Sequence, residues 1–137
     1  MNPLFIDSGP LVAVANPGDQ HERDAVRGWR QLAEESRPLY SSEHVMDEVA
    51  TAITRTQGGA SASAWVRKQL SSGLIRWLQT TPTDLETATD WLEKYSDQRL
   101  SFTDVVSFTL MRRERIEEVF SFDHHFSTTG FSQWSGG

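Results

Sequence analysis

Short apolar runs alternate along the chain with longer stretches in which apolar residues recur every three or four positions. Each short run is bounded by turn-forming or polar residues, which is typical of strands in a buried sheet. These runs predict strands at 3–7 ("PLFID"), 38–41 ("PLYS"), 74–80 ("LIRWLQT") and, as the last clear one, 119–123 ("VFSFD").

The longer stretches have the spacing of amphipathic helices. Pro10 fits the first turn of a short helix, because its missing N–H is not needed there. Ser41 or Ser42 can cap a helix that runs to about Thr56, and Gly73 is a good stop for another. The predicted helices cover 9–16, 19–36, the segment after Ser42, 60–72, the segment from Thr83, and 101–113.

Two of these helices have a face that we expect to be buried. The helix over 19–36 should turn inward Ala25, Val26, Trp29, Leu32 and Ala33. A capping box at 83–86 would open another helix. The side chains of that helix that we expect to face the core are Leu85, Ala88, Leu92 and Tyr95.

Strands that alternate with helices predict a mainly parallel, roughly five-stranded sheet with helices on both faces, an α/β/α sandwich. The one Gly/Ser-rich break, "TQGGASAS" (56–63), falls between two predicted helices and joins them. The length of 137 residues fits one domain, so we expect a single domain over 1–137.

Four carboxylates stand at unusual places in this pattern. Asp7 and Asp123 end the first and last predicted strands, which in a parallel sheet puts both at the same edge. Asp104 lies in the first turn of an apolar helix, and Glu48 falls among the apolar positions of its own helix. The fold can therefore bring all four to one end of the sheet.

Each carboxylate also has a structural explanation. Ser101 and Asp104 have the spacing of a capping box, and Asp7 and Asp123 can cap the turns after their strands. Glu48 lies too far along its helix to cap it, so it would need a buried basic partner. As a group, however, four clustered acids repel one another, and they would bind divalent cations or have a raised pKa.

An all-oxygen ligand set favours Mg²⁺, or Mn²⁺ as a substitute, over zinc or copper. One or two such ions suit the hydrolysis of a phosphodiester, because the metal can orient the phosphate and activate water. The chain has no cysteine, which excludes disulfides and thiolate chemistry. Its net charge of -6 argues against binding nucleic acid through bulk positive charge, but it does not exclude a metal-dependent nuclease.

The chain resembles the PIN-domain ribonucleases, particularly the VapC-type toxins of bacterial toxin–antitoxin pairs. The resemblance runs nearly end to end, over "FIDSGPLVA", "SSEHVMDEVATAI", "LSFTDVVSFTLMRRERI" and "VFSFDHHFSTTGF". By similarity, Asp7, Glu48, Asp104 and Asp123 match the acidic metal-binding positions of the family, and Ser8 matches the hydroxyl residue after the first acid.

This resemblance implies a PIN-like α/β/α fold and Mg²⁺-dependent endonucleolytic cleavage of RNA that leaves a 5′-phosphate and a 3′-hydroxyl. It also implies a homodimer and a VapB-like antitoxin that occludes the active site. Asp7, Asp104 and Asp123 would hold the metal, directly or through water. Glu48 would be a ligand or a base, and Ser8 would position water or the phosphate unless it only caps the helix that follows.

Four other functions are to be weighed. The first, a PIN-fold nuclease that acts on structured DNA, would usually carry extra acids and helical insertions that this short chain lacks. A haloacid-dehalogenase-like phosphatase normally has a second aspartate two residues after the first, where this chain has Gly9. A response-regulator receiver would need an acidic pair near the first strand, which is absent. A non-catalytic PIN-fold module that binds RNA or protein would be expected to have lost acids that are all present here.

Several other residues are weaker candidates. His124 and His125 are either phosphate contacts or turn residues, Trp134 is a possible base-stacking residue, and the arginines at 112, 113 and 115 either grip RNA or end a helix. Unlike a signal peptide, the chain begins without a basic segment, and Asp7 interrupts its first apolar run. No apolar run is long enough to span a bilayer. We therefore expect a cytoplasmic protein without membrane contact.

Overall fold

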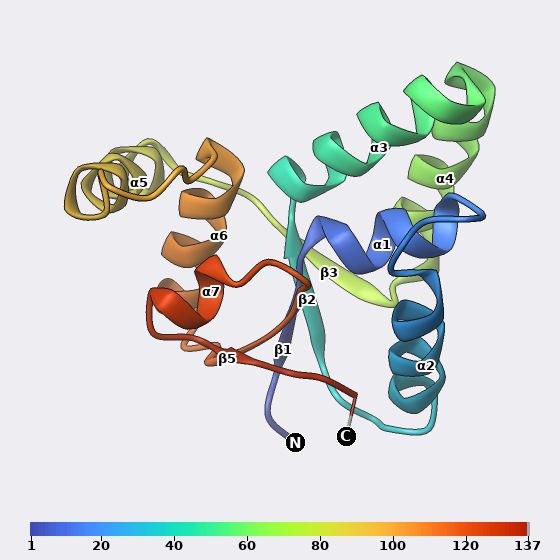
Figure 1. Ribbon diagram of the computed structural model, residues 1–137, viewed down its shortest axis with the longest axis horizontal. Coiled ribbons are helices and arrows are strands. Elements are labelled where there is room, and N and C mark those ends of the chain that lie inside the picture. Colours follow the sequence, from blue (N-terminus) through green and yellow to red (C-terminus); the bar gives the residue numbers. More distant parts are fainter. Residues whose placement is uncertain (137) are drawn as a thin grey trace.

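The computed structural model describes residues 1–136 and is built on a sheet of short strands flanked by helices (Figure 1). The strands are β1 (Leu4–Ile6), β2 (Leu39–Ser42), β3 (Ile75–Leu78), β4 (Glu118–Phe120) and β5 (Ser132–Gln133). The helices are α1 (Ser8–Ala15), α2 (Glu22–Ala33), α3 (Glu43–Gln57), α4 (Gly59–Ser72), α5 (Pro82–Lys94), α6 (Phe102–Arg113) and α7 (His125–Thr128).

The five strands pair in the order β3-β2-β1-β4-β5, and every pair is parallel. Helices α1 and α2 lie on one side of the sheet, while α5, α6 and α7 lie on the other (Figure 1). The prediction of a mainly parallel, five-stranded sheet between helical layers is confirmed. Because all strands point the same way, the segments that leave their carboxyl ends meet at one edge of the sheet.

Helix α6 is the central helix of the fold. Every residue from Val105 to Met111 is buried, so the helix is enclosed on nearly all sides rather than along one stripe. Its first turn is fixed by a capping box between Ser101 and Asp104. The buried core therefore holds the start of α6, and with it Asp104, in a fixed position.

The end of the sheet differs from the prediction in two ways. Strand β4 ends at Phe120, so Asp123 lies beyond the strand, in the turn that leads into α7. A fifth strand, β5, pairs with β4 near the carboxyl terminus, where the sequence shows no strand pattern. Its residues Ser132 and Gln133 are both exposed and polar, so periodicity carries no signal there.

Two helices differ from the prediction in where they begin or in which residues they bury. Helix α5 is capped by Thr81, which forms its capping box with Asp84, so the predicted box at 83–86 is wrong. Leu85 is 36% exposed, because the buried face of the helix passes through Asp84 and Ala88 instead. Helix α2 is shorter at both ends than predicted, and Ala33 lies on its exposed side.

Gly28 lies on the buried face of α2, although it was not among the residues predicted to face inward. A Cβ atom at this position would lie 2.5 Å from Cζ of Phe120, so only glycine lets the helix approach the end of β4. Trp134 packs on the same ring, with the centroids 4.9 Å apart. Among the described residues, no helix is long and apolar enough to cross a membrane.

We predict that Gly28→Ala destabilises the protein by about 1–3 kcal/mol, because the added methyl group must displace Phe120 from the core. Chemical denaturation measures this change. Gly59→Ala is the matched control, since a Cβ at Gly59 meets no atom within 4 Å and alanine favours the helix. Equal effects of the two substitutions would contradict the close approach of α2 to β4.

Candidate active site

The carboxyl edge of the sheet opens into a cleft that contains every acidic candidate from the sequence. The cleft has a volume of about 370 Å³. Its walls come from the ends of β1 and β4 and from the first halves of α1, α3 and α6. The lining residues include Asp7, Ser8, His21, Glu48, Ser101, Asp104, Phe122 and Asp123.

Asp7 lies at the base of the cleft and is only 5% exposed. The register of β1 and β4 explains its position, because Ile6 pairs with Phe120 and the next residues, Asp7 and Ser121, therefore leave the sheet side by side. Ser121 Oγ donates a 2.7 Å hydrogen bond to Asp7 Oδ2, and the Asp7 backbone N–H donates to the Phe120 carbonyl. The carboxylate is thus oriented by the neighbouring strand.

Burial raises the pKa of Asp7 from 3.8 to about 7, against the opposing hydrogen bonds from Ser121 and the Ser8 backbone. The charges of Asp104 and Glu48 raise it further. Burial likewise raises the pKa of Asp104, with added repulsion from Asp123 and Glu48. These carboxylates therefore repel one another across the cleft, and a bound cation would relieve that repulsion.

Asp104 has both the capping role and the position in the cleft that the sequence left as alternatives. Its Oδ2 accepts a 3.1 Å hydrogen bond from the Ser101 N–H, and its own N–H donates to Ser101 Oγ at 3.0 Å. This capping box leaves the second carboxylate oxygen outside the reciprocal pair of bonds. Capping accordingly positions the carboxylate toward the cleft and does not compete with metal binding.

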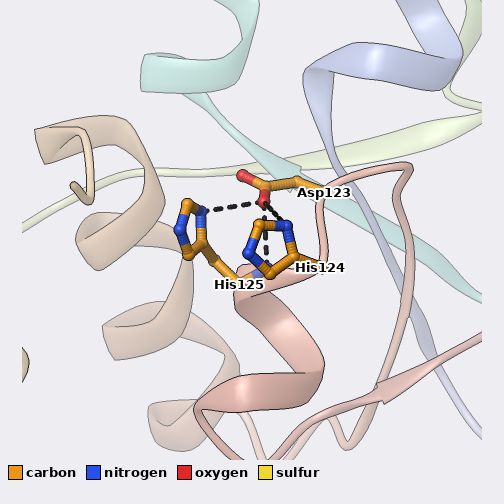
Figure 2. A group of neighbouring side chains, drawn as sticks. All are labelled: Asp123, His124 and His125. Carbon is orange, nitrogen blue, oxygen red and sulfur yellow. Dashed lines mark hydrogen bonds and ion pairs between the residues drawn. The ribbon is translucent and has the colours of Figure 1, made fainter. Parts of the chain in front are cut away.

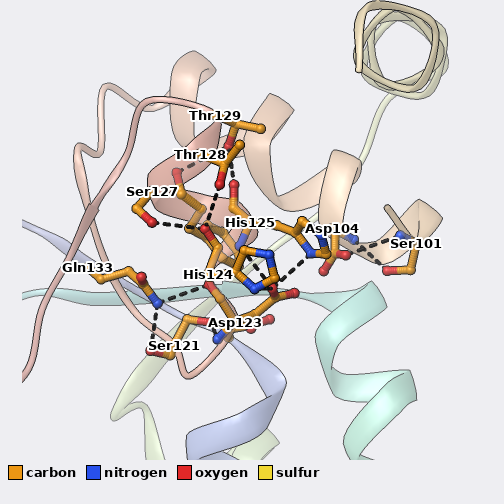
Figure 3. A network of polar contacts seen from close by, with 12 residues as sticks. Ser101, Asp104, Ser121, Asp123, His124, His125, Ser127, Thr128, Thr129 and Gln133 are labelled. Atoms are coloured by element: carbon orange, nitrogen blue, oxygen red, sulfur yellow. Dashed lines mark hydrogen bonds and ion pairs between the residues drawn. The ribbon is translucent and has the colours of Figure 1, made fainter. Parts of the chain in front are cut away.

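Asp123 is held by a polar network at the start of α7 (Figure 3). Its N–H donates to Ser121 Oγ at 3.0 Å, and its carbonyl accepts a 2.9 Å hydrogen bond from Gln133 Nε2. Its Oδ1 accepts a hydrogen bond from the His125 N–H, so the turn-capping alternative is also realised. Since Ser121 Oγ bonds to both Asp7 and Asp123, one hydroxyl group links the two carboxylate residues.

Glu48 and Ser8 occupy the open side of the cleft. Glu48 is exposed and borders the buried stripe of α3 instead of lying within it, so it requires no buried basic partner and that alternative is wrong. Helix α1 begins at Ser8 with Asp7 in the N-cap position, so Ser8 is not the cap residue. Both side chains are therefore available to the cleft.

The structure adds cleft residues that the sequence did not single out. The rings of His21 and Phe122 stack with centroids 4.4 Å apart and an interplanar angle of 16°, and both line the cleft. A second hollow shares Ser8 and Glu48 with the cleft and extends along α3 to Arg55. Sequence spacing could not reveal either feature, because the residues come from different elements.

Other candidates from the sequence lie elsewhere. Arg113 pairs with Asp84, and Arg112 lies 4.4 Å over the ring of Phe131, at the end of α6 opposite to Asp104. Arg115 lines a hollow near the start of β1 and β4. Trp134 is partly buried against the core, which accounts for it without a nucleic-acid base.

The chain belongs to the PIN-domain family, whose model matches residues 4–132. It is also similar to a protein of Mycobacterium tuberculosis named 23S rRNA-specific endonuclease VapC20, with 32% identity over 128 residues. The match covers 93% of this chain and 95% of VapC20. The resemblance to PIN-domain proteins that the sequence motifs indicate is confirmed.

Solved structures agree with this assignment. The crystal structure of VapC20, described as a toxin that cleaves the sarcin–ricin loop, matches with a TM-score of 0.83 and 31% identity, over 93% of this chain and 95% of that one. VapBC2 of Rickettsia felis bound to a promoter DNA fragment matches with a TM-score of 0.69 at 10% identity (96% and 97% covered). DNA-bound VapBC of Salmonella typhimurium matches with a TM-score of 0.68 at 13% identity (100% of both chains covered). The last two likenesses concern the fold alone.

We predict that Asp7→Asn stabilises the metal-free protein above neutral pH. Because the pKa of Asp7 is raised to about 7 on folding, the folded protein binds more protons than the unfolded chain from about pH 4 to 7, and stability falls as pH rises through this window. The gain should be about 2–4 kcal/mol near pH 8 and about a third of that near pH 5.

Chemical denaturation in the presence of a chelator measures this gain. Addition of Mg²⁺ near pH 8 should raise the stability of the native chain and leave Asp7→Asn unaffected, because the buried charge is what the cation offsets. A stability gain that did not vary with pH would contradict the raised pKa of Asp7.

Proposed function

We propose that this chain is a metal-dependent endoribonuclease and the toxin of a type II toxin–antitoxin pair. The observation that carries the proposal is the convergence of Asp7, Glu48, Asp104 and Asp123 in one cleft at the carboxyl edge of the sheet. The full-length similarity to an rRNA-specific endonuclease supports it. The alternative of a non-catalytic module gains no support, since the acidic set is complete and faces a common space.

The residues fit a hard divalent cation. The donors are carboxylate oxygens, which Mg²⁺ prefers and Mn²⁺ accepts. Burial and mutual repulsion raise the pKa of both Asp7 and Asp104, so a cation would stabilise their ionised forms. We propose Asp7, Asp104 and Asp123 as the metal-holding residues. When bound, Mg²⁺ would orient the scissile phosphate, lower the pKa of water and offset charge on the attacking and leaving oxygens.

The remaining cleft residues would transfer the proton of the attacking water and bind the RNA. Glu48, on the open side, accepts the proton of the attacking water, and the Ser8 hydroxyl donates a hydrogen bond to a phosphate oxygen. Water adds to phosphorus as the bond to the 3′ oxygen breaks, and that oxygen takes up a proton from solvent, which leaves a 5′-phosphate and a 3′-hydroxyl. Arg55, in the hollow beside the cleft, can contact a neighbouring phosphate, and the stacked rings of His21 and Phe122 offer a surface for an unstacked base.

The substrate that we propose is a structured loop of ribosomal RNA. VapC20, which aligns with 93% of this chain, is named for cleavage of 23S rRNA. A loop suits the open cleft, because its unstacked bases can reach side chains that a paired helix would exclude. We accordingly propose that the protein acts in the cytoplasm, where ribosomal RNA is found.

We predict that Asp104→Asn lowers the rate of RNA cleavage at least about 100-fold, because it removes a metal-binding charge. The assay is Mg²⁺-dependent cleavage of intact ribosomes, with primer extension to map the cut and a chelator control. The matched control is Asp84→Asn, which alters the same capping-box position in α5, away from the cleft. It should lower stability by about 0.5–2 kcal/mol or more and leave the specific activity of the folded protein intact.

The comparison separates the capping role of Asp104 from its catalytic role. If both variants lose stability and both retain cleavage, Asp104 is only a cap and the proposed function is wrong. A cut within a ribosomal RNA loop would support the proposed substrate, whereas chelator-sensitive cuts confined to other RNA would support the nuclease and contradict that substrate.

We also propose that the chain forms a homodimer and binds a VapB-like antitoxin that occludes the cleft. The fold is shared with toxins solved as VapBC complexes, which supports an antitoxin partner. Production of the chain alone should arrest bacterial growth, and Glu48→Gln should relieve the arrest.

The mass of the purified protein, measured by light scattering, should correspond to a multiple of 15.5 kDa and include a dimer. A monomeric protein at every concentration would contradict the homodimer.

A further inference from the structure

Three metal-ligating side chains meet at the start of α7, beside the cleft (Figure 2). They are Asp123, His124 and His125, and one ligand atom of each lies within 4.8 Å of the others. Asp123 Oδ1 is 2.9 Å from His125 Nδ1 and 3.9 Å from His124 Nδ1. The Nδ1 atoms of both imidazole rings therefore lie near the same carboxylate oxygen.

The His125 ring has a buried nitrogen without a hydrogen-bond partner in the described part of the chain. Although Nδ1 lies 2.9 Å from Asp123 Oδ1, it is not directed for a hydrogen bond to that oxygen. A buried polar atom left without a hydrogen bond is unfavourable. A cation between the nitrogen and the carboxylate would bond to both atoms and remove that cost.

The types of ligand select the class of cation. Two imidazole nitrogens and one carboxylate oxygen suit Zn²⁺ and related transition metals, whereas Mg²⁺ prefers oxygen alone. In a tetrahedral zinc site with bonds of about 2.0–2.1 Å, neighbouring ligand atoms lie about 3.3 Å apart. The separations of 2.9 and 3.9 Å at Asp123 Oδ1 lie on either side of that value, so small rotations of the two rings suffice.

The surrounding network holds these ligands in place. Gln133 Nε2 donates hydrogen bonds to the carbonyls of Ser121 and Asp123 at 3.1 and 2.9 Å, which ties the turn to β5. The His125 carbonyl accepts a 2.8 Å hydrogen bond from Thr129 Oγ1. His124 is 77% exposed, so the fourth position of a site here is open to water or to an incoming ligand.

We propose that Asp123, His124 and His125 form a transition-metal site, of the Zn²⁺ class, which shares Asp123 with the carboxylate cleft and inhibits hydrolysis when occupied. Binding of the ion is independent of any activity of the protein. The inhibitory effect rests on the proposed function, because Asp123 belongs both to this cluster and to the carboxylate set of the cleft. The same residue would then serve two cations of different chemistry.

The first test is binding of the metal alone. Co²⁺, followed by its visible absorption, and Zn²⁺, followed by calorimetry, are titrated into the native chain, His124→Ala and the control His44→Ala. His44 lies on α3, apart from the cluster. His124→Ala should weaken binding at least about tenfold, because it removes one of three protein ligands, and His44→Ala should bind as the native chain does. Equal binding by all three proteins, or none by any, would overturn the proposal.

The second test follows the cleavage of ribosomes in Mg²⁺ as Zn²⁺ is added. The concentration for half inhibition should rise at least about tenfold in His124→Ala and stay unchanged in His44→Ala. Unchanged inhibition in His124→Ala would mean that Zn²⁺ acts at the other carboxylates, which contradicts the inhibitory role. If His124-dependent Co²⁺ binding occurs in a protein without nuclease activity, the metal site stands and the proposed function fails.

Discussion

The burial of a carboxylate at the end of β1 is the constraint on which the rest of the site depends. Asp7 is 5% exposed, and it is fixed there by the parallel register of β1 and β4, which puts Ser121 beside it. An isolated buried charge is unfavourable, so the surrounding structure either keeps the group protonated or supplies a cation. The metal site that we propose is the second solution, since the neighbouring carboxylates of Asp104 and Glu48 repel Asp7 and a cation would offset the charge of all three.

The caps of the fold and the proposed ligands of the site are the same side chains. Asp104 closes the capping box of α6, and Asp123 accepts the hydrogen bond that starts α7. A structural role and a chemical role are usually offered as rival explanations for such an acid. Here the hydrogen bonds that satisfy the helix ends also hold the carboxylates, so the site is organised before any ligand arrives.

Much of this arrangement could be predicted from the sequence, because strands β1 to β4 and the caps carry local signals. The placement of Asp7 and Asp104 follows from a strand end and a helix start, and both are short-range features. What could not be predicted depends on contacts between distant elements. Strand β5 is two exposed polar residues that pair only because β4 is there, and the stacking of His21 on Phe122 joins a loop to the end of the sheet. Leu85 was misplaced because Asp84, held by Arg113 from α6, takes the buried position one turn before Ala88.

The two backbone amides that hold these carboxylates have a further consequence. The N–H of Ser101 donates to Asp104 at the start of α6, and that of His125 donates to Asp123 at the start of α7. Any ligand that draws charge from one carboxylate weakens the corresponding hydrogen bond. In a nitrogen–proton correlation spectrum the two amide resonances are therefore built-in reporters, and their separate shifts tell which of the two carboxylates an ion has reached.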